Sequence, residues 1–233
     1  MLWMNTYTAL VPVFNEEKFV TTSLDRLFKI RELDQVLIID DGSTDNSVEL
    51  IEEFIKDKKN CTLIKFNNNK GKGQVLKRAQ QHLTTSHVVI HDADLEYFPD
   101  DIIPMIEKAS NHKQDLILGS RFIGDLERKN LYKRTLLANK IMSKFFSIVN
   151  NRKVSDIATC YKLMTTQFFT SIEIKEKGFS IEVEILSKFL KTNKEIIEVP
   201  IKYEGRGYDE GKKIKAIDGI FYMFNILKYK LTS

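Results

Sequence analysis

Two aspartates separated by a single residue follow an apolar run near the middle of the sequence. The run Val88–Ile90 precedes Asp92 and Asp94, and Glu96 stands two residues further on. Carboxylates at positions i and i+2 of a turn can converge on one hard cation, and Mg²⁺ or Mn²⁺ would complete its shell with water and a diphosphate. Such a cation neutralises a departing diphosphate as a Lewis acid. The alternative is an acidic loop that caps the following helix.

Three further polar loops stand earlier in the chain, and each follows a run rich in valine, isoleucine or leucine. They are Pro12–Glu17, Asp40–Asp45 and Asn67–Gly73. A carboxylate of the second loop can accept hydrogen bonds from a nucleotide base or a ribose hydroxyl, or it can cap a helix. The third loop offers positive charge and close backbone approach, but its glycine and lysine spacing is not that of a P-loop.

An alternation of short apolar runs and amphipathic stretches predicts the scaffold that holds these loops. The pattern predicts strands over Thr8–Val13, Gln35–Asp40, Thr62–Phe66, His87–His91, Asp115–Gly119 and Ile196–Tyr203. It predicts helices over Glu16–Lys29, Asp45–Lys58, Gly73–Leu83, Asp100–Ser110, Leu131–Asn150, Ile181–Leu190 and Ile214–Lys230. Alternating strands and helices indicate a mostly parallel α/β sheet with helices on both faces. Ligands of such sheets bind beyond the carboxyl ends of the strands, so we expect the four loops to share one crevice.

The composition is that of one ordinary folded domain. The chain has 233 residues, of which 42% are hydrophobic and 29% charged, and no linker or repeat interrupts residues 1–233. Two cysteines, Cys61 and Cys160, exclude a disulfide scaffold and a four-cysteine zinc site, and they fit a reducing compartment. Because no signal-peptide pattern and no long uninterrupted apolar stretch is present, we expect a cytoplasmic protein.

The charge is divided unevenly along the chain. The net charge is +4, but residues 1–125 hold 15 Lys and Arg against 20 Asp and Glu, and residues 126–233 hold 21 against 12. Eight basic residues interleave with apolar ones between Leu126 and Lys153: Arg128, Lys129, Lys133, Arg134, Lys140, Lys144, Arg152 and Lys153. This pattern is typical of a basic amphipathic helix on an anionic membrane surface, or of a core-packed helix with a solvated basic face.

These motifs, taken in order, resemble a known family of enzymes. The chain resembles inverting family 2 glycosyltransferases of the GT-A fold, which is a Rossmann-like α/β fold. The resemblance lies in Val11–Glu17, Asp40–Ser43, Asp92–Asp94 and Gly119–Phe122. The branch with dolichol-phosphate mannose synthases and bacterial polyprenyl-phosphate glycosyltransferases resembles the chain further at Val154–Lys162 and Glu210–Ile214. The resemblance extends from about Ala9 to Lys230.

The resemblance implies a role for each matching residue. The residues implied to bind the nucleotide-sugar are Pro12, Phe14, Glu16, Ile39, Asp41, Lys72, Asp92, Ala93, Asp94, Arg121, Arg206 and Lys212. Those implied to hold Mg²⁺ or Mn²⁺ are Asp94, Glu96 and Asp92, and the implied catalytic residues are Asp156, near the reacting centre, and Asp94. The family often has Tyr in place of Phe14 and Gln in place of Glu96.

Some of these residues also have structural interpretations. Arg121 could form a surface salt bridge, and Asp156 could cap a helix or pair with Arg152 or Lys153. His91 and Cys160 are expected to be core residues. Glu182 and Glu184, on an apolar helix, are candidates only for contacts to the residues of the site, not to its ligands.

The resemblance implies metal-dependent transfer of a sugar, mannose or glucose, from a GDP- or UDP-sugar such as GDP-mannose to polyprenyl or dolichyl phosphate. Residues 1–125 would form the donor half and residues 126–233 the acceptor half. The protein as a whole would be peripheral on the cytoplasmic face of the membrane and would have no nucleic-acid partner. The main alternative is transfer to a saccharide hydroxyl in polysaccharide synthesis. Two weaker alternatives are a sugar-phosphate nucleotidyltransferase, disfavoured because Pro12–Glu17 contains no glycine, and a non-catalytic module.

Overall fold

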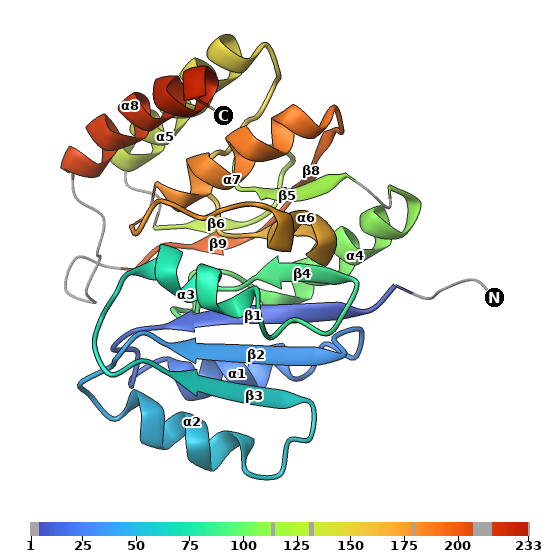
Figure 1. Ribbon diagram of the computed structural model, residues 1–233, viewed down its shortest axis with the longest axis vertical. Coiled ribbons are helices and arrows are strands. Elements are labelled where there is room, and N and C mark those ends of the chain that lie inside the picture. Colours follow the sequence, from blue (N-terminus) through green and yellow to red (C-terminus); the bar gives the residue numbers. More distant parts are fainter. Residues whose placement is uncertain (1–4, 113–114, 131–132, 179, 207–215, 233) are drawn as a thin grey trace.

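The structure is a computed structural model that describes residues 5–112, 115–130, 133–178, 180–206 and 216–232 (Figure 1). Its centre is a seven-stranded sheet in the order β3-β2-β1-β4-β7-β5-β8. The strands are β1 (Tyr7–Val13), β2 (Gln35–Asp40), β3 (Cys61–Lys65), β4 (His87–Ile90), β5 (Leu116–Ser120), β7 (Lys162–Thr165) and β8 (Ile196–Pro200). All strand pairs of this sheet are parallel except those of β7, which runs antiparallel to β4 and β5. The predicted mostly parallel α/β sheet is confirmed.

Helices cover both faces of the sheet (Figure 1). One face packs against α1 (Val20–Leu27), α2 (Ser47–Ile55) and α4 (Ile102–Asn111). The other packs against α3 (Lys72–Ala79), α5 (Lys133–Asn150), α6 (Thr166–Ser171), α7 (Ile181–Phe189) and α8 (Ala216–Thr232). Short 3₁₀ turns, η1 (Pro99–Asp101) and η2 (Leu190–Thr192), precede α4 and follow α7.

Alternation along the strands supplies both halves of the core. Val11 and Ile38 belong to the cluster with α1 and α4, whereas their neighbours Leu10 and Leu37 belong to the cluster with α3 and α7. Successive side chains of a strand point to opposite faces, so a central strand covered on both sides is apolar throughout. This explains why the predicted strands read as continuous valine, isoleucine and leucine runs.

Several elements differ from the sequence prediction, which included neither α6 nor β6. Strand β7 was not predicted, because it is only four residues long and begins with a charged residue, Lys162, that is fully buried. The predicted strand Ile196–Tyr203 is two strands: β8 ends at Pro200, and β9 (Tyr203–Glu204) pairs instead with β6 (Arg128–Lys129) in a separate two-stranded sheet. Proline has no N–H to donate, which favours the end of a strand there.

Candidate active site

The loops that follow β1, β2, β3 and β4 are joined at one edge of the sheet. The backbone N–H of Asp41 donates to the carbonyl of Val13 at 2.8 Å, linking the first two loops. The carboxylate of Asp41 accepts from the backbone N–H groups of Lys70 and Gly71, both at 2.8 Å, linking the second loop to the third. Lys72 Nζ lies 2.8 Å from Asp92 Oδ1, linking the third to the fourth. The predicted convergence of these loops is therefore confirmed.

The two adjacent aspartates after β2 have different tasks. Asp40 closes the turn, because one of its oxygens accepts from the N–H groups of Gly42 and Ser43 at 3.0 Å, and Gly42 has a φ of 72° that suits glycine. Asp41 instead orders the third loop, and its burial raises the pKa of its carboxyl despite the two N–H donors. Neither aspartate caps α2, which begins at Ser47, and the nucleotide contact expected of Asp41 stays a prediction.

Arg206 lies among three carboxylates, and together they form what we call the acidic centre: Glu16, Asp94, Glu96 and Arg206. Arg206 Nη1 is 3.0 Å from Glu16 Oε2, and its Nη2 is 3.1 Å from Asp94 Oδ2. Glu96 accepts from the Arg206 backbone N–H at 2.9 Å and from the hydroxyl of Tyr203 at 2.6 Å. Arg206, which lies 110 positions after Glu96 in the sequence, is thereby held against the first and fourth loops.

The acidic centre carries more negative charge than Arg206 balances. Burial, with the nearby charges of Glu96 and Asp92, raises the pKa of Asp94 to about 7, although Arg206 acts in the opposite direction. The donor set consists of carboxylate oxygens, which suits a hard divalent cation and would lower the energy of ionised Asp94. Within the described residues, no three His, Cys, Asp or Glu side chains are arranged as a complete metal site.

Asp92 is paired with a lysine of the third loop rather than with Arg206. Lys72 Nζ contacts Asp92 on one side and Glu182 Oε1, at 3.0 Å, on the other. Burial is the largest single influence and would raise the pKa of Asp92, but the charge and hydrogen bond of Lys72, with smaller contributions from His91 and Cys160, together lower that pKa. Burial alone would likewise lower the pKa of Lys72, but Asp92 and Glu182 raise it well above the ordinary value. Both groups are therefore ionised at neutral pH.

Arg121 and Asp156 form a buried, two-point ion pair. Arg121 Nε and Nη2 lie 2.7 and 2.8 Å from the two oxygens of Asp156, and the Arg121 backbone N–H donates to the same carboxylate at 3.0 Å. Asp156 has no exposed surface, and the guanidinium lies 4.9 Å from the ring centre of Tyr203. The surface salt bridge considered for Arg121 is wrong, and Asp156 pairs with neither Arg152 nor Lys153.

The remaining predicted residues lie at the strand ends or outside the described chain. Pro12 and Phe14 are half-buried, whereas Ile39 and Ala93 are buried. Lys212, with the Glu210–Ile214 motif, lies outside the described residues. Sequence reasoning missed Tyr203, which holds Glu96 and stacks on Arg121; its position in a strand-like run gave no signal of either contact.

Two residues beside the acidic pair are core residues, as predicted. The ring of His91 lies between Ser23 Oγ, at 3.1 Å, and the hydroxyl of Tyr161, at 2.9 Å. Burial lowers the pKa of His91 to about 4, so the ring is neutral at neutral pH. Cys160 is buried, and burial raises the pKa of its thiol. Neither group is available for acid–base chemistry at neutral pH.

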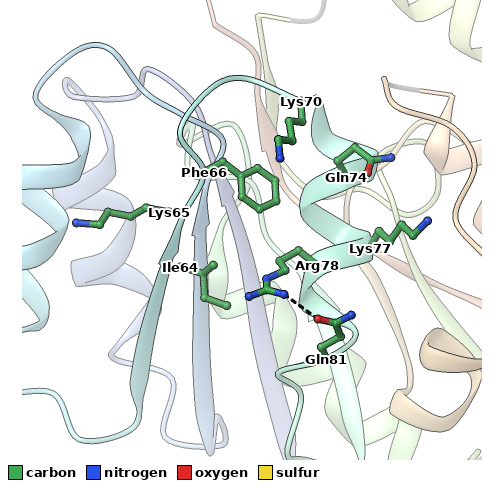
Figure 2. A pocket seen from close by; sticks show the side chains of 8 residues that line it. All are labelled: Ile64, Lys65, Phe66, Lys70, Gln74, Lys77, Arg78 and Gln81. Carbon is green, nitrogen blue, oxygen red and sulfur yellow. Dashed lines mark hydrogen bonds between the residues drawn. The ribbon is translucent and has the colours of Figure 1, made fainter.

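A separate hollow of about 380 Å³ lies between the end of β3 and α3 (Figure 2). Figure 2 shows the ring of Phe66 at its centre, with Lys70 above and Arg78 reaching in from α3. Lys70 Nζ is 5.0 Å from the centre of that ring, and Arg78 donates to Gln81 at 2.8 Å. The lining is cationic and includes none of the predicted site residues, so this hollow is distinct from the acidic centre.

The outer helices α5 and α8 pack together at one end of the molecule (Figure 1). Met142 and Phe146 of α5 are buried, but three apolar side chains of the same helix, Leu137, Ile141 and Ile148, are 54–68% exposed. On α8, Phe221, Phe224, Leu227 and Leu231 are 46–84% exposed. Among the described helices, none has the length and apolar character required to cross a bilayer.

Comparison with known families decides the class of the protein. The family described as "Glycosyl transferase family 2" matches residues 8–172, which contain all four loops, Arg121 and Asp156. The chain belongs to glycosyl transferase family 2. It is a glycosyltransferase, and the prediction of an enzyme of this family is confirmed.

Several curated members of this family are similar over most of the chain. A dolichol-phosphate mannosyltransferase of Pyrococcus furiosus is 24% identical over 96% of this chain and 64% of its own length. A UDP-N-acetylglucosamine–dolichyl-phosphate N-acetylglucosaminyltransferase of Methanococcus voltae is 27% identical over 94% of both chains. A dolichyl-phosphate β-glucosyltransferase of Saccharomyces cerevisiae is 28% identical over 80% of this chain and 61% of its own length. The chain thus spans less than two thirds of the first and third of these relatives.

Solved structures of similar fold confirm the GT-A architecture. Glucosyl-3-phosphoglycerate synthase of Mycobacterium tuberculosis superposes with a TM-score of 0.74, at 14% identity, over 97% of this chain and 80% of that one. The same enzyme in complex with Mn²⁺, UDP and glucosyl-3-phosphoglycerate superposes with a TM-score of 0.71, at 15% identity, over 97% and 79%. At this identity the likeness concerns the fold.

Proposed function

We propose that this glycosyltransferase transfers a hexose from a nucleotide-sugar to a polyprenyl or dolichyl phosphate, with inversion at the anomeric carbon. The observation that carries the proposal is the acidic centre: three partly or fully buried carboxylates, Glu16, Asp94 and Glu96, gathered around Arg206 at the carboxyl edge of a GT-A sheet. The dolichyl-phosphate relatives support the choice of acceptor. GDP-mannose and UDP-glucose are the donors to be tested first.

In this proposal the four loops bind the donor. Pro12, Phe14, Glu16, Ile39 and Asp41 lie beside the base and ribose, with Ala93 and Asp92 beside the ribose and diphosphate. Asp94, with Glu96 and Asp92 nearby, holds Mg²⁺ or Mn²⁺, as the oxygen-rich donor set favours. When bound, the cation would neutralise charge on the leaving diphosphate. Lys72, Arg121, Arg206 and Lys212 contribute positive charge for the phosphates.

The acceptor argument depends on the state of Asp156. Both of its oxygens are engaged by Arg121, so the carboxylate is poorly placed to remove a proton. A phosphate acceptor is already ionised at neutral pH and needs no strong general base, whereas a saccharide hydroxyl must lose a proton. We infer that Asp156 fixes Arg121 beside the reacting centre, and that the acceptor is a phosphate.

The outer helices supply a surface suited to a lipid-linked acceptor. Lys140 and Lys144 are exposed on α5 beside exposed Leu137 and Ile141. Apolar side chains that insert among acyl chains, with lysines at the level of anionic headgroups, are the features of an interfacial helix. We infer a peripheral position on the cytoplasmic face of the membrane.

The deciding experiment combines a donor screen with an acceptor comparison. The protein is incubated with Mn²⁺ or Mg²⁺, GDP-mannose or UDP-glucose, and either polyprenyl phosphate or a saccharide acceptor, and release of nucleoside diphosphate is measured. We expect a lipid-linked product when polyprenyl phosphate is the acceptor and no product when a saccharide is the acceptor. Turnover on saccharides without turnover on polyprenyl phosphate would instead establish the polysaccharide alternative.

Membrane binding is measured separately by sedimentation with liposomes. Binding should require anionic lipid and weaken with salt, and changing Lys133, Arg134, Lys140 and Lys144 to Glu should reduce it. Unchanged partitioning of that variant would contradict the membrane interpretation.

A further inference from the structure

Four charges of alternating sign lead from the predicted donor edge into the interior, and we call them the charge row: Asp92, Lys72, Glu182 and Lys162. Lys72 Nζ is 2.8 Å from Asp92 Oδ1 and 3.0 Å from Glu182 Oε1. The other oxygen of Glu182 is 2.5 Å from Lys162 Nζ, and Lys162 also donates to the carbonyl of Thr159. The signs cancel along the row, so each charge has an opposite neighbour.

Exposure falls steadily along the charge row. The side chain of Asp92 is 26% exposed, that of Lys72 13%, that of Glu182 3% and that of Lys162 0%. The outer two residues are therefore open to a ligand, which in the proposed function is the donor diphosphate, while the inner two can reach no ligand. Any effect of the inner pair on the donor must pass through Lys72 or Asp92.

The backbone that carries Lys72 is fixed independently of the row. The N–H of Gly73 donates to the carbonyl of Lys177 at 2.9 Å. A Cβ at position 73 would lie 1.7 Å from the carbonyl oxygen of Glu176, so only glycine allows this approach. With the Cα of Lys72 held in place, the position of its ammonium depends on its side-chain contacts alone.

We propose that Glu182 and Lys162 are positioning residues that hold the Lys72 ammonium at the diphosphate of the donor. This inference rests on the proposed function and extends it. A lysine side chain has four rotatable bonds, and ordering it costs conformational freedom. With Asp92 as its one carboxylate partner, Lys72 would turn toward that group or toward solvent. Glu182 holds the ammonium between two carboxylates, and Lys162 fixes the orientation of Glu182.

The row also joins two parts of the site that are far apart in sequence. Lys162 begins β7, and the segment from Asp156 to Thr159 leads into that strand. Because Lys162 contacts both Thr159 and Glu182, it ties the Asp156 segment to the N-terminal end of α3. Charges that are positioned before the ligand arrives need no reorganisation during the reaction.

The test measures binding of GDP and UDP with Mn²⁺ by calorimetry, and the separate KM values for nucleotide-sugar and acceptor. Glu182→Gln is expected to weaken binding of the preferred nucleoside diphosphate, and to raise the donor KM, about tenfold, because the ammonium is misplaced. The acceptor KM should not change. Glu184→Gln is the matched control, since Glu184 is an equally buried carboxylate of α7 that contacts Lys188 and the backbone N–H groups of Lys175 and Glu176, but not Lys72.

A double variant separates positioning from folding. Glu182→Gln with Lys162→Met removes both inner charges and leaves no unpaired one in the interior. If this variant recovers the thermal stability of the wild type but still binds nucleoside diphosphate about tenfold more weakly, the positioning role is supported. Wild-type binding in either Glu182 variant, or an equal loss in Glu184→Gln, would overturn it. Absence of nucleoside diphosphate binding by the wild type itself would instead overturn the proposed function, and this inference with it.

Discussion

The carboxyl edge of the sheet and the outer helices α5 and α8 differ in which side chains they bury and which they expose. Near the sheet edge, carboxylates and cations are buried and paired, as in Asp156 with Arg121 and Glu182 with Lys162. On α5 and α8, leucine, isoleucine and phenylalanine side chains are exposed beside lysines. Burying charge is costly unless it is paired, and exposing a cluster of apolar side chains is typical of a binding surface. The contrast indicates that the first region is built for charged ligands and the second for an apolar partner.

The sharpest contrast is expected from breaking the buried ion pair. Asp156→Asn leaves the Arg121 guanidinium without a charged partner, which should lower the free energy of unfolding by about 3–5 kcal/mol. Asp25→Asn is the control, because its ion pair with Lys29 is exposed and should contribute less than about 1 kcal/mol. Urea denaturation measures both variants, and equal effects would show that the buried pair has no special weight.

The acidic centre should affect catalysis more than folding. Asp94→Asn is expected to reduce sugar transfer about 10²–10³-fold, the range seen when one electrostatic contact to a transition state is removed. The stability of this variant at pH 8 should not fall, because a pKa of about 7 shows that ionised Asp94 is disfavoured in the folded chain. Transfer within tenfold of the wild type would contradict a central role for Asp94.

His91 gives the sheet edge a dependence on pH. Its pKa is about 4 when folded and about 6.5 when unfolded, so the unfolded chain takes up the proton first as the pH falls. The contribution of His91 to the free energy of unfolding is therefore fully present above pH 6.5 and is lost as the pH falls toward 4. The loss amounts to about 3 kcal/mol, because each unit of difference between the two pKa values corresponds to about 1.36 kcal/mol. His91→Gln should flatten unfolding curves measured between pH 7 and 4, and the exposed His112→Gln should not.

The smallest effect on stability is expected on the outer helices. Ile141→Gln on α5 should change the free energy of unfolding by less than about 0.5 kcal/mol, because this side chain is 54% exposed. Phe146→Ala on the same helix removes a fully buried ring and should cost about 3–5 kcal/mol. The first variant should nevertheless bind anionic liposomes less well. A large loss of stability in Ile141→Gln would show that this face supports the fold instead.

Much of the fold followed from local pattern, because both faces of the parallel strands are buried and each such strand is a continuous apolar run. The four loops at the carboxyl edge followed from the same argument. Strand β7 could not be predicted from its apolar pattern, because the first residue of the strand is Lys162, a buried lysine paired with Glu182. The partners of the charged residues could not be predicted from the sequence either. The basic residues next to Asp156 in the sequence are Arg152 and Lys153, whereas its partner in the structure, Arg121, is 35 residues away.

The sequence by itself determined the class of fold, the family, and the loops that carry the chemistry, since these depend on residue type and spacing along the chain. The tertiary structure decided which charges meet. It directed Asp92 to Lys72 and Asp94 to Arg206, a residue 112 positions further along the chain. The physical reason is that periodicity reports how each segment is buried, whereas an ion pair depends on distances between segments, which are set when the strands take their places in the sheet.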